Sequence, residues 1–308
     1  MKKIFVVVFM ACFVVFNLDN IDVKAAELNV DQIKHLESLG FTEEEVLNMP
    51  ETEIIKNLEI DGEVVAIDKK FFKVIERDTS NDNVSTYDAD NSSKEVVIEL
   101  DEDTYLKEVQ LEEAKRSNDV SIISSDSHTT SYKTVTTTIV SLTAKQQYRV
   151  KTAITWSIMP SNRKIDVIGT SINSSFWAPS KDSQYGQQSW SVRHSCDQIK
   201  YLTTSYSSGS NSWSKGSSGY ALSIDLPNDI VKSYACYSEE VKTLSAFSYY
   251  TADKLTSTTQ IDAYGKYLHQ ESTLQIAPAI TFYPLSFGVS ASQSSKFTES
   301  GTHAQIKF

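Results

Sequence analysis

Apolar and polar side chains alternate with a period of two residues through the second half of the chain. The clearest run covers 148–158, and its apolar side consists of Tyr148, Val150, Thr152, Ile154, Trp156 and Ile158. The same alternation recurs at 220–226 and 285–289. Alternation of this kind is typical of antiparallel strands with one buried and one hydrated face. It predicts about eight strands and almost no helix between 131 and 308, arranged as an antiparallel β-sandwich or an open β-barrel.

Helical signals dominate near the start of the chain. Asn29 and Gln32 have the spacing of a capping box, and Thr42 and Glu45 repeat it. Pro50 suits the first turn of a further helix. We therefore expect two or three short helices here, packed against another part of the protein.

The segment after these helices is mixed. Residues 63–75 and 95–100 are strand candidates, and 104–116 is a helix candidate that Asp103 can cap. The predicted class is α+β. In chain order, the predicted organisation is a signal peptide at 1–25, an acidic helical and mixed unit at 26–116, a linker at 117–130 and a β-rich domain at 131–308.

The first 25 residues have the layout of a secretory signal peptide. Two lysines precede an unbroken apolar run from Ile4 to Phe16, and Val23 and Ala25 suit the −3 and −1 positions of a cleavage site. At 1.5 Å per residue, this run is too short for a hydrocarbon core of ~30 Å. We expect cleavage near Ala25 and a secreted, extracellular protein, free or associated with the cell surface.

Charge is distributed unevenly along the chain. Residues 26–127 carry a net charge of −17, whereas residues 128–308 carry +5. Such asymmetry is typical of two units with different roles. The positive charge of the second unit is diffuse and the whole chain is acidic at −11, so nucleic acid is not an expected partner.

Two cysteines follow the signal segment, Cys196 and Cys236. An even number of cysteines in an oxidising compartment predicts a disulfide between them. In the chain-entropy account, a bridge that closes about 40 residues stabilises the fold by roughly 3–4 kcal/mol. His194 lies two residues before Cys196 and raises the alternative of a thiolate nucleophile, but the disulfide is the simpler interpretation.

Motifs that carry chemistry are absent from the sequence. The five histidines do not have zinc-ligand spacing, and no nucleophile elbow, phosphate-binding loop or dinucleotide-binding turn occurs. The histidines are His35, His128, His194, His269 and His303. No catalytic residue, metal ligand or cofactor is therefore predicted.

Aromatic residues in Ser/Gly-rich surroundings are the most suggestive feature of the β-rich part. Exposed aromatic rings of this kind can stack on sugars or enter a membrane interface, and they can also close the ends of a core. The candidates for ligand contact are Trp177, Tyr185, Trp190 and Trp213.

Three classes of function are open on this sequence. The first is a non-enzymatic binding module that contacts a cell-surface glycan, a protein or a membrane. The second is a β-structured pore-forming or membrane-active protein, in which Ser/Thr-rich strands such as 132–143 form hairpins and the acidic segment is an inhibitory pro-segment. The third is an extracellular hydrolase without a recognisable motif. We expect the first. The oligomeric state is not indicated.

Two short stretches resemble uncharacterised exported proteins of Gram-positive bacteria. They are Leu39-Gly40-Phe41-Thr42-Glu43-Glu44 and the region from Met159-Pro160 to Asp166-Val167-Ile168-Gly169. This resemblance implies an exported location and no particular activity.

Overall fold

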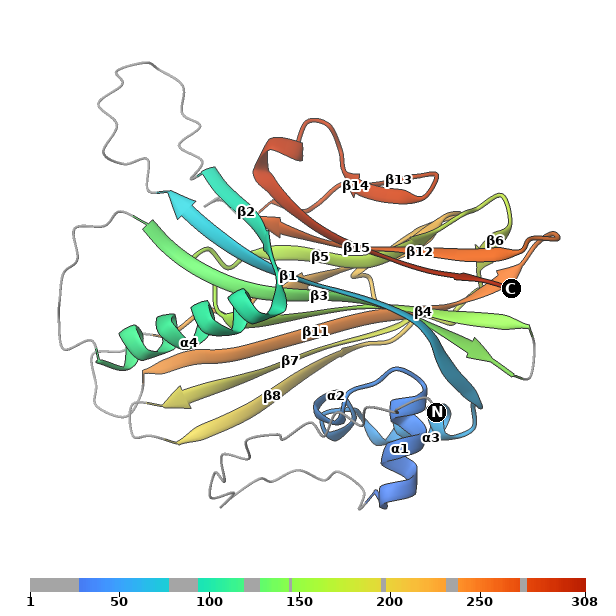
Figure 1. The fold of residues 1–308 in the computed structure, drawn as a ribbon, viewed down its shortest axis with the longest axis horizontal. Helices are drawn as coiled ribbons and strands as arrows, with labels where there is room; N and C mark the ends of the chain where they lie inside the picture. The colour runs from blue at the N-terminus through green and yellow to red at the C-terminus, as the bar shows by residue number, and fades with distance from the viewer. Residues whose placement is uncertain are drawn as a thin grey trace, which may run out of the picture.

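The computed structural model describes residues 28–77, 94–118, 128–143, 146–194, 198–230, 238–271 and 276–308. The predicted signal peptide and both Cys196 and Cys236 lie outside these residues. Within them the fold is built mostly from antiparallel strands with a few helices, as the alternation predicts (Figure 1).

The larger sheet runs in the order β2-β1-β3-β4-β11-β7-β8, and β6 pairs with β11. Its strands are β1 (Gly62–Arg77), β2 (Lys94–Leu100), β3 (His128–Leu142), β4 (Gln147–Ile158), β6 (Trp177–Pro179), β7 (Tyr185–His194), β8 (Ile199–Tyr206) and β11 (Glu239–Lys254). All of its pairings are antiparallel.

The smaller sheet runs in the order β15-β12-β5-β10-β9. Its strands are β5 (Ile165–Ile172), β9 (Trp213–Gly216), β10 (Gly219–Asp225), β12 (Gln260–Gln270) and β15 (Phe297–Lys307). A separate hairpin of β13 (Ile280–Tyr283) and β14 (Ser286–Val289) precedes the 3-10 turn η2 (Ser294–Lys296). Neither sheet closes into a barrel in the described residues.

One hydrophobic core joins the two sheets. Val150, Ile154 and Trp156 of β4 are buried in it, as the two-residue period predicts, and they pack with Ile168 of β5 and Tyr267 of β12. The opposite side of β4 faces away from this core and carries the functional candidates described below.

Three helices cover part of the outer face of the larger sheet: α1 (Val30–Ser38), α2 (Glu43–Leu47) and α3 (Glu51–Leu58). Both predicted capping boxes are present, from Asn29 and Thr42. Figure 1 shows these helices on one side of the molecule and the β13–β14 hairpin on the other. The hairpin buries Phe287 against Val167 and Leu268 of the smaller sheet.

A longer helix, α4 (Glu102–Asn118), packs against the same larger sheet through Tyr105 and Val109. It begins before the expected position, because Asp101 rather than Asp103 accepts the hydrogen bond from the Thr104 amide at 2.9 Å. Asp101, two residues before the expected capping residue Asp103, therefore follows the last residue of β2 and caps the helix.

The acidic segment is part of the larger sheet. β1 pairs with β3 from Gly62 opposite Leu142 to Arg77 opposite His128, and β2 forms the edge beside it. The strands expected at 63–75 and 95–100 are therefore continuous with the β-rich part of the chain.

Candidate functional site

The outer face of the larger sheet has a part covered by α1–α3, a part covered by α4 and a part that is open to solvent. The part covered by α1–α3 is aromatic. The ring of Phe41 lies 5.6 Å from that of Phe247 and 5.7 Å from that of Tyr249, both on β11, and Tyr185 of β7 packs beside them. These edge-to-face contacts fix the loop between α1 and α2 onto the sheet.

Two cations lie beneath the helices, although a polar outward position on a strand is normally hydrated. Lys151 is 3% exposed and Arg149 is 1% exposed, both on β4. Lys151 Nζ donates to the Gly40 carbonyl at 2.7 Å and to Glu45 Oε2 at 2.5 Å. Burial lowers the pKa of Lys151, and the Glu45 carboxylate opposes this shift. The helical unit thus supplies the counter-ion of Lys151.

Arg149 is less well paired than Lys151. Its guanidinium lies 4.3 Å from the ring centroid of Tyr249, and that phenol donates to Glu53 of α3. Arg149 Nε and Nη1 have no hydrogen-bond partner among the described residues. Burial lowers the pKa of Arg149, and the Tyr249 and Glu53 oxygens oppose this shift. A buried guanidinium with free donors has unused capacity for an oxyanion.

Beside α2, a row of hydroxyl side chains crosses five strands of the outer face, and Glu44 of α2 forms a hydrogen bond with one of them, Ser245. In register order from β3 to β8, this hydroxyl row consists of Thr134, Thr155, Ser245, Ser189 and Thr203. Thr155 and Thr203 are exposed. A second line beside it joins Thr243 to Ser191, whose hydroxyls lie 2.7 Å apart, and continues to Tyr201, which is 52% exposed.

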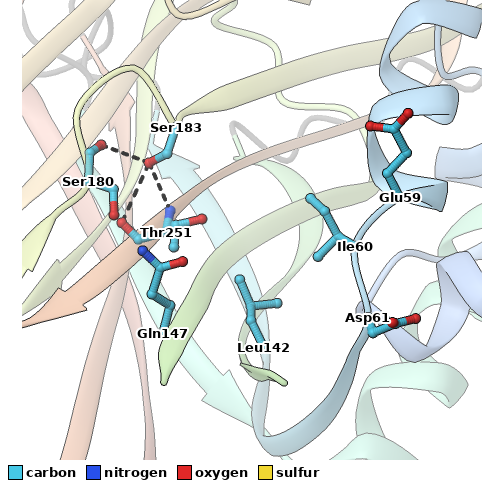
Figure 2. A pocket seen from close by; sticks show the side chains of 8 residues that line it. All are labelled: Glu59, Ile60, Asp61, Leu142, Gln147, Ser180, Ser183 and Thr251. Carbon is cyan, nitrogen blue, oxygen red and sulfur yellow. Dashed lines mark hydrogen bonds between the residues drawn. The ribbon is translucent and has the colours of Figure 1, made fainter. Parts of the chain in front are cut away.

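A pocket of about 400 Å³ opens at the edge of α3 (Figure 2). It is lined by Glu59, Ile60, Asp61, Leu142, Gln147, Ser180, Ser183 and Thr251. Figure 2 shows the turn after α3 on one side and the two serines with Thr251 on the other. Gln147 and Ser180 both donate to the Asp253 carboxylate, which holds their side chains in place.

A third polar cluster lies between the sheets. His269 of β12 is fully buried, with Nδ1 2.7 Å from Asp166 Oδ2 and Nε2 3.3 Å from Glu95 Oε1. Burial by itself lowers the pKa of His269, but the carboxylates of Asp166 and Glu95 raise it by a larger amount, so that the pKa is about 10. Nearby, burial lowers the pKa of Lys133 to about 8 and raises that of Glu271 to about 7. This cluster is closed to solvent, so we assign it a structural role.

The four aromatic residues singled out from the sequence are dispersed. Trp177 and Trp213 are buried in the core between the sheets, and Trp190 packs against that core while half-buried. Tyr185 is buried beneath the helices. The structure therefore does not bring them together on one exposed surface, because each packs in or against a hydrophobic core.

Sequence reasoning missed the buried cations. The period of two correctly places Arg149 and Lys151 opposite the core, but it cannot show that helices cover that side. The sequence did contain a signal for the burial of Lys133. Its side chain lies on the same side of β3 as Val135 and Ile139, which are both fully buried.

The described residues contain no group of three or more potential ligands that could hold a metal ion, and none of their helices could cross a bilayer. No family model matches this chain, and no curated protein matches it.

Solved structures with a distant likeness to this chain include the following two. One is described as a pore forming protein; it is 7% identical with a TM-score of 0.28, and the alignment covers 61% of this chain and 96% of that one. The other is the C-terminal domain of the AgI/II polypeptide BspA of Streptococcus agalactiae. It is also 7% identical with a TM-score of 0.28, over 76% of this chain and 84% of that one. At this similarity neither likeness supports an inference about function.

Proposed function

We propose that this chain is an exported, non-enzymatic binding module whose ligand is a cell-surface glycan, bound on the open outer face of the larger sheet. The hydroxyl row is the observation that carries this proposal. We also interpret the two sheets as a β-sandwich, because they share a single hydrophobic core.

The open face suits a neutral sugar. Serine and threonine hydroxyls both donate and accept hydrogen bonds, as sugar hydroxyls do. Tyr201 adds an exposed aromatic ring beside Ser191 on which a pyranose can stack. The row needs little ordering on binding, because its side chains are short and their strands are paired on both sides, apart from β8 at the edge.

The pocket beside α3 provides a second contact region of the same character. Ile60 and Leu142 give it an apolar wall, and Ser180, Ser183 and Gln147 give it hydrogen-bonding groups. A few directed polar groups on an apolar wall are typical of small-ligand sites.

A glycan array followed by titration calorimetry tests the proposal. Thr155→Val and Thr203→Val remove two exposed hydroxyls, and Tyr201→Ala removes the ring. We expect each variant to weaken binding of the selected glycan by about tenfold, through one or two lost hydrogen bonds for the threonines and a lost stacking contact for Tyr201. Thr256→Val, an exposed threonine in the β11–β12 loop, is the matched control and should bind as the wild type does. Equal affinity for all four variants would exclude this face.

A further inference from the structure

We propose that the β4 surface beneath α1–α3 is a binding site for an acidic amphipathic peptide segment of another protein, and that the helical unit occupies this site in the structure. This site is distinct from the hydroxyl row and takes a ligand of different chemistry. Its defining groups are Arg149 and Lys151 together with the rings of Tyr185, Phe247 and Tyr249.

The first argument is the chemistry of the covered surface. A permanent interface gains little from buried ions, because the cost of desolvation offsets their mutual attraction and apolar residues of similar size often stabilise as much or more. Here two cations, Arg149 and Lys151, are almost fully buried two residues apart on the same side of one strand. Such a surface is complementary to a segment that presents carboxylates beside apolar side chains.

The second argument is that the present occupant has this chemistry. Glu45 and Glu53 project from α2 and α3 towards Lys151 and Tyr249, while Leu36, Val46 and Ile54 supply the apolar support. The helical unit forms no strand pairing with the sheet in the described part of the chain. Its chain connection to β1 is the short turn at 59–61. A segment held by side chains and a single connection can be exchanged without dismantling the sheet.

The third argument is the spare capacity of Arg149. Nε and Nη1 are buried without a partner among the described residues, so the helical unit leaves part of the site unsatisfied. A peptide that places a carboxylate against this guanidinium would gain a charge-assisted, bidentate hydrogen bond that the helical unit does not make. This difference gives an external segment a means of competing with a tethered one.

The probe is a labelled synthetic peptide with the sequence of residues 28–61, titrated into the full chain; it represents an acidic amphipathic segment without the additional carboxylate opposite Arg149. In the Glu45→Gln/Glu53→Gln protein the cover is weakened and the sheet is unchanged. We expect this protein to bind the peptide about tenfold or more tightly than the wild type does, with affinity falling as salt increases. Glu43→Gln/Glu51→Gln is the matched control, because it makes the same charge change at exposed positions of the same helices.

Two further arms make the result decisive. A peptide that itself carries both Glu→Gln changes should bind about tenfold more weakly, and this arm leaves the protein untouched. Arg149→Met/Lys151→Met, added to the weakened protein, should abolish binding of the wild-type peptide, with folding checked by near-ultraviolet circular dichroism. Equal binding of both peptides would overturn the proposal. Absence of peptide binding would also overturn the proposal, whether or not hydrogen exchange shows that α1–α3 open. A dimer of the full chain that exchanges its helices would assign the site to a second copy and overturn it too.

Discussion

Asp166 and His269 form a fully buried ion pair, with Oδ2 of the carboxylate 2.7 Å from Nδ1 of the imidazole. Asp166 also accepts the backbone amide of Gln270 at 2.9 Å and the phenol of Tyr267. The other imidazole nitrogen faces Glu95 of β2 at 3.3 Å. The pair therefore links the smaller sheet to the edge of the larger one.

Asp166→Asn should lower the free energy of unfolding by about 3–5 kcal/mol, because it leaves a buried imidazolium with one carboxylate instead of two. Glu299→Gln is the control, since Glu299 is 54% exposed and its ion pair with Lys266 should contribute about 0–1 kcal/mol. Urea unfolding of both variants measures the difference. Similar losses for the two variants would show that the buried pair has no special role.

Glu271 should make stability depend on pH. Burial raises the pKa of its carboxyl to about 7, above the ordinary value of 4.5. The folded state therefore binds this proton more tightly, and the contribution is fully present below about 4.5 and lost as the pH rises to about 7. The difference in unfolding free energy between wild type and Glu271→Gln should fall across this window and be flat above it. A constant difference from pH 4.5 to 8 would contradict the prediction.

Gly265 of β12 approaches the larger sheet where a side chain cannot fit. A Cβ there would overlap the hydroxyl of Thr137 and lie 2.6 Å from that of Thr152. Gly265→Ala should therefore destabilise the protein by about 1–3 kcal/mol through overpacking. Gly209→Ala, with open space around it, is the control and should change stability by less than about 0.5 kcal/mol. Thermal unfolding of the two variants separates these outcomes.

The disulfide between Cys196 and Cys236 stays a prediction. β7 ends at His194, two residues before Cys196, and β11 begins at Glu239, three residues after Cys236; His194 and Glu239 are register partners on neighbouring strands. Cys196→Ser should lower the melting temperature under oxidising conditions, corresponding to roughly 3–4 kcal/mol, and dithiothreitol should lower that of the wild type to match. An unchanged melting temperature in Cys196→Ser would rule out a stabilising bridge.

The mass of the protein recovered from culture medium, without reduction, should correspond to residues 26–308 less two hydrogens. Cleavage near residue 120 would remove β1 and β2 and expose the edge of β3, which pairs with β1 along its length. We therefore expect the acidic segment to be retained. A product that begins near residue 120 would instead favour the pore-forming alternative, and liposome leakage would test it.

The sequence by itself determined the elements whose signals are local. Two capping boxes marked α1 and α2 because the bonding residues lie three positions apart, and alternation marked strands such as β4 because side chains on a strand change sides at every residue. These signals do not depend on what packs against them.

Only the tertiary structure decided which side of each strand is covered and by what. Arg149 and Lys151 lie on the side of β4 that faces away from the core, where residues are normally solvated, yet three helices bury them. Thr155 lies on the same side of β4, four residues after Lys151, and is exposed. Trp177 and Trp213 have loop-like surroundings in sequence and lie in the core. Period and composition report which residues share a face, but burial depends on contacts between segments far apart in the chain, and no local pattern encodes those contacts.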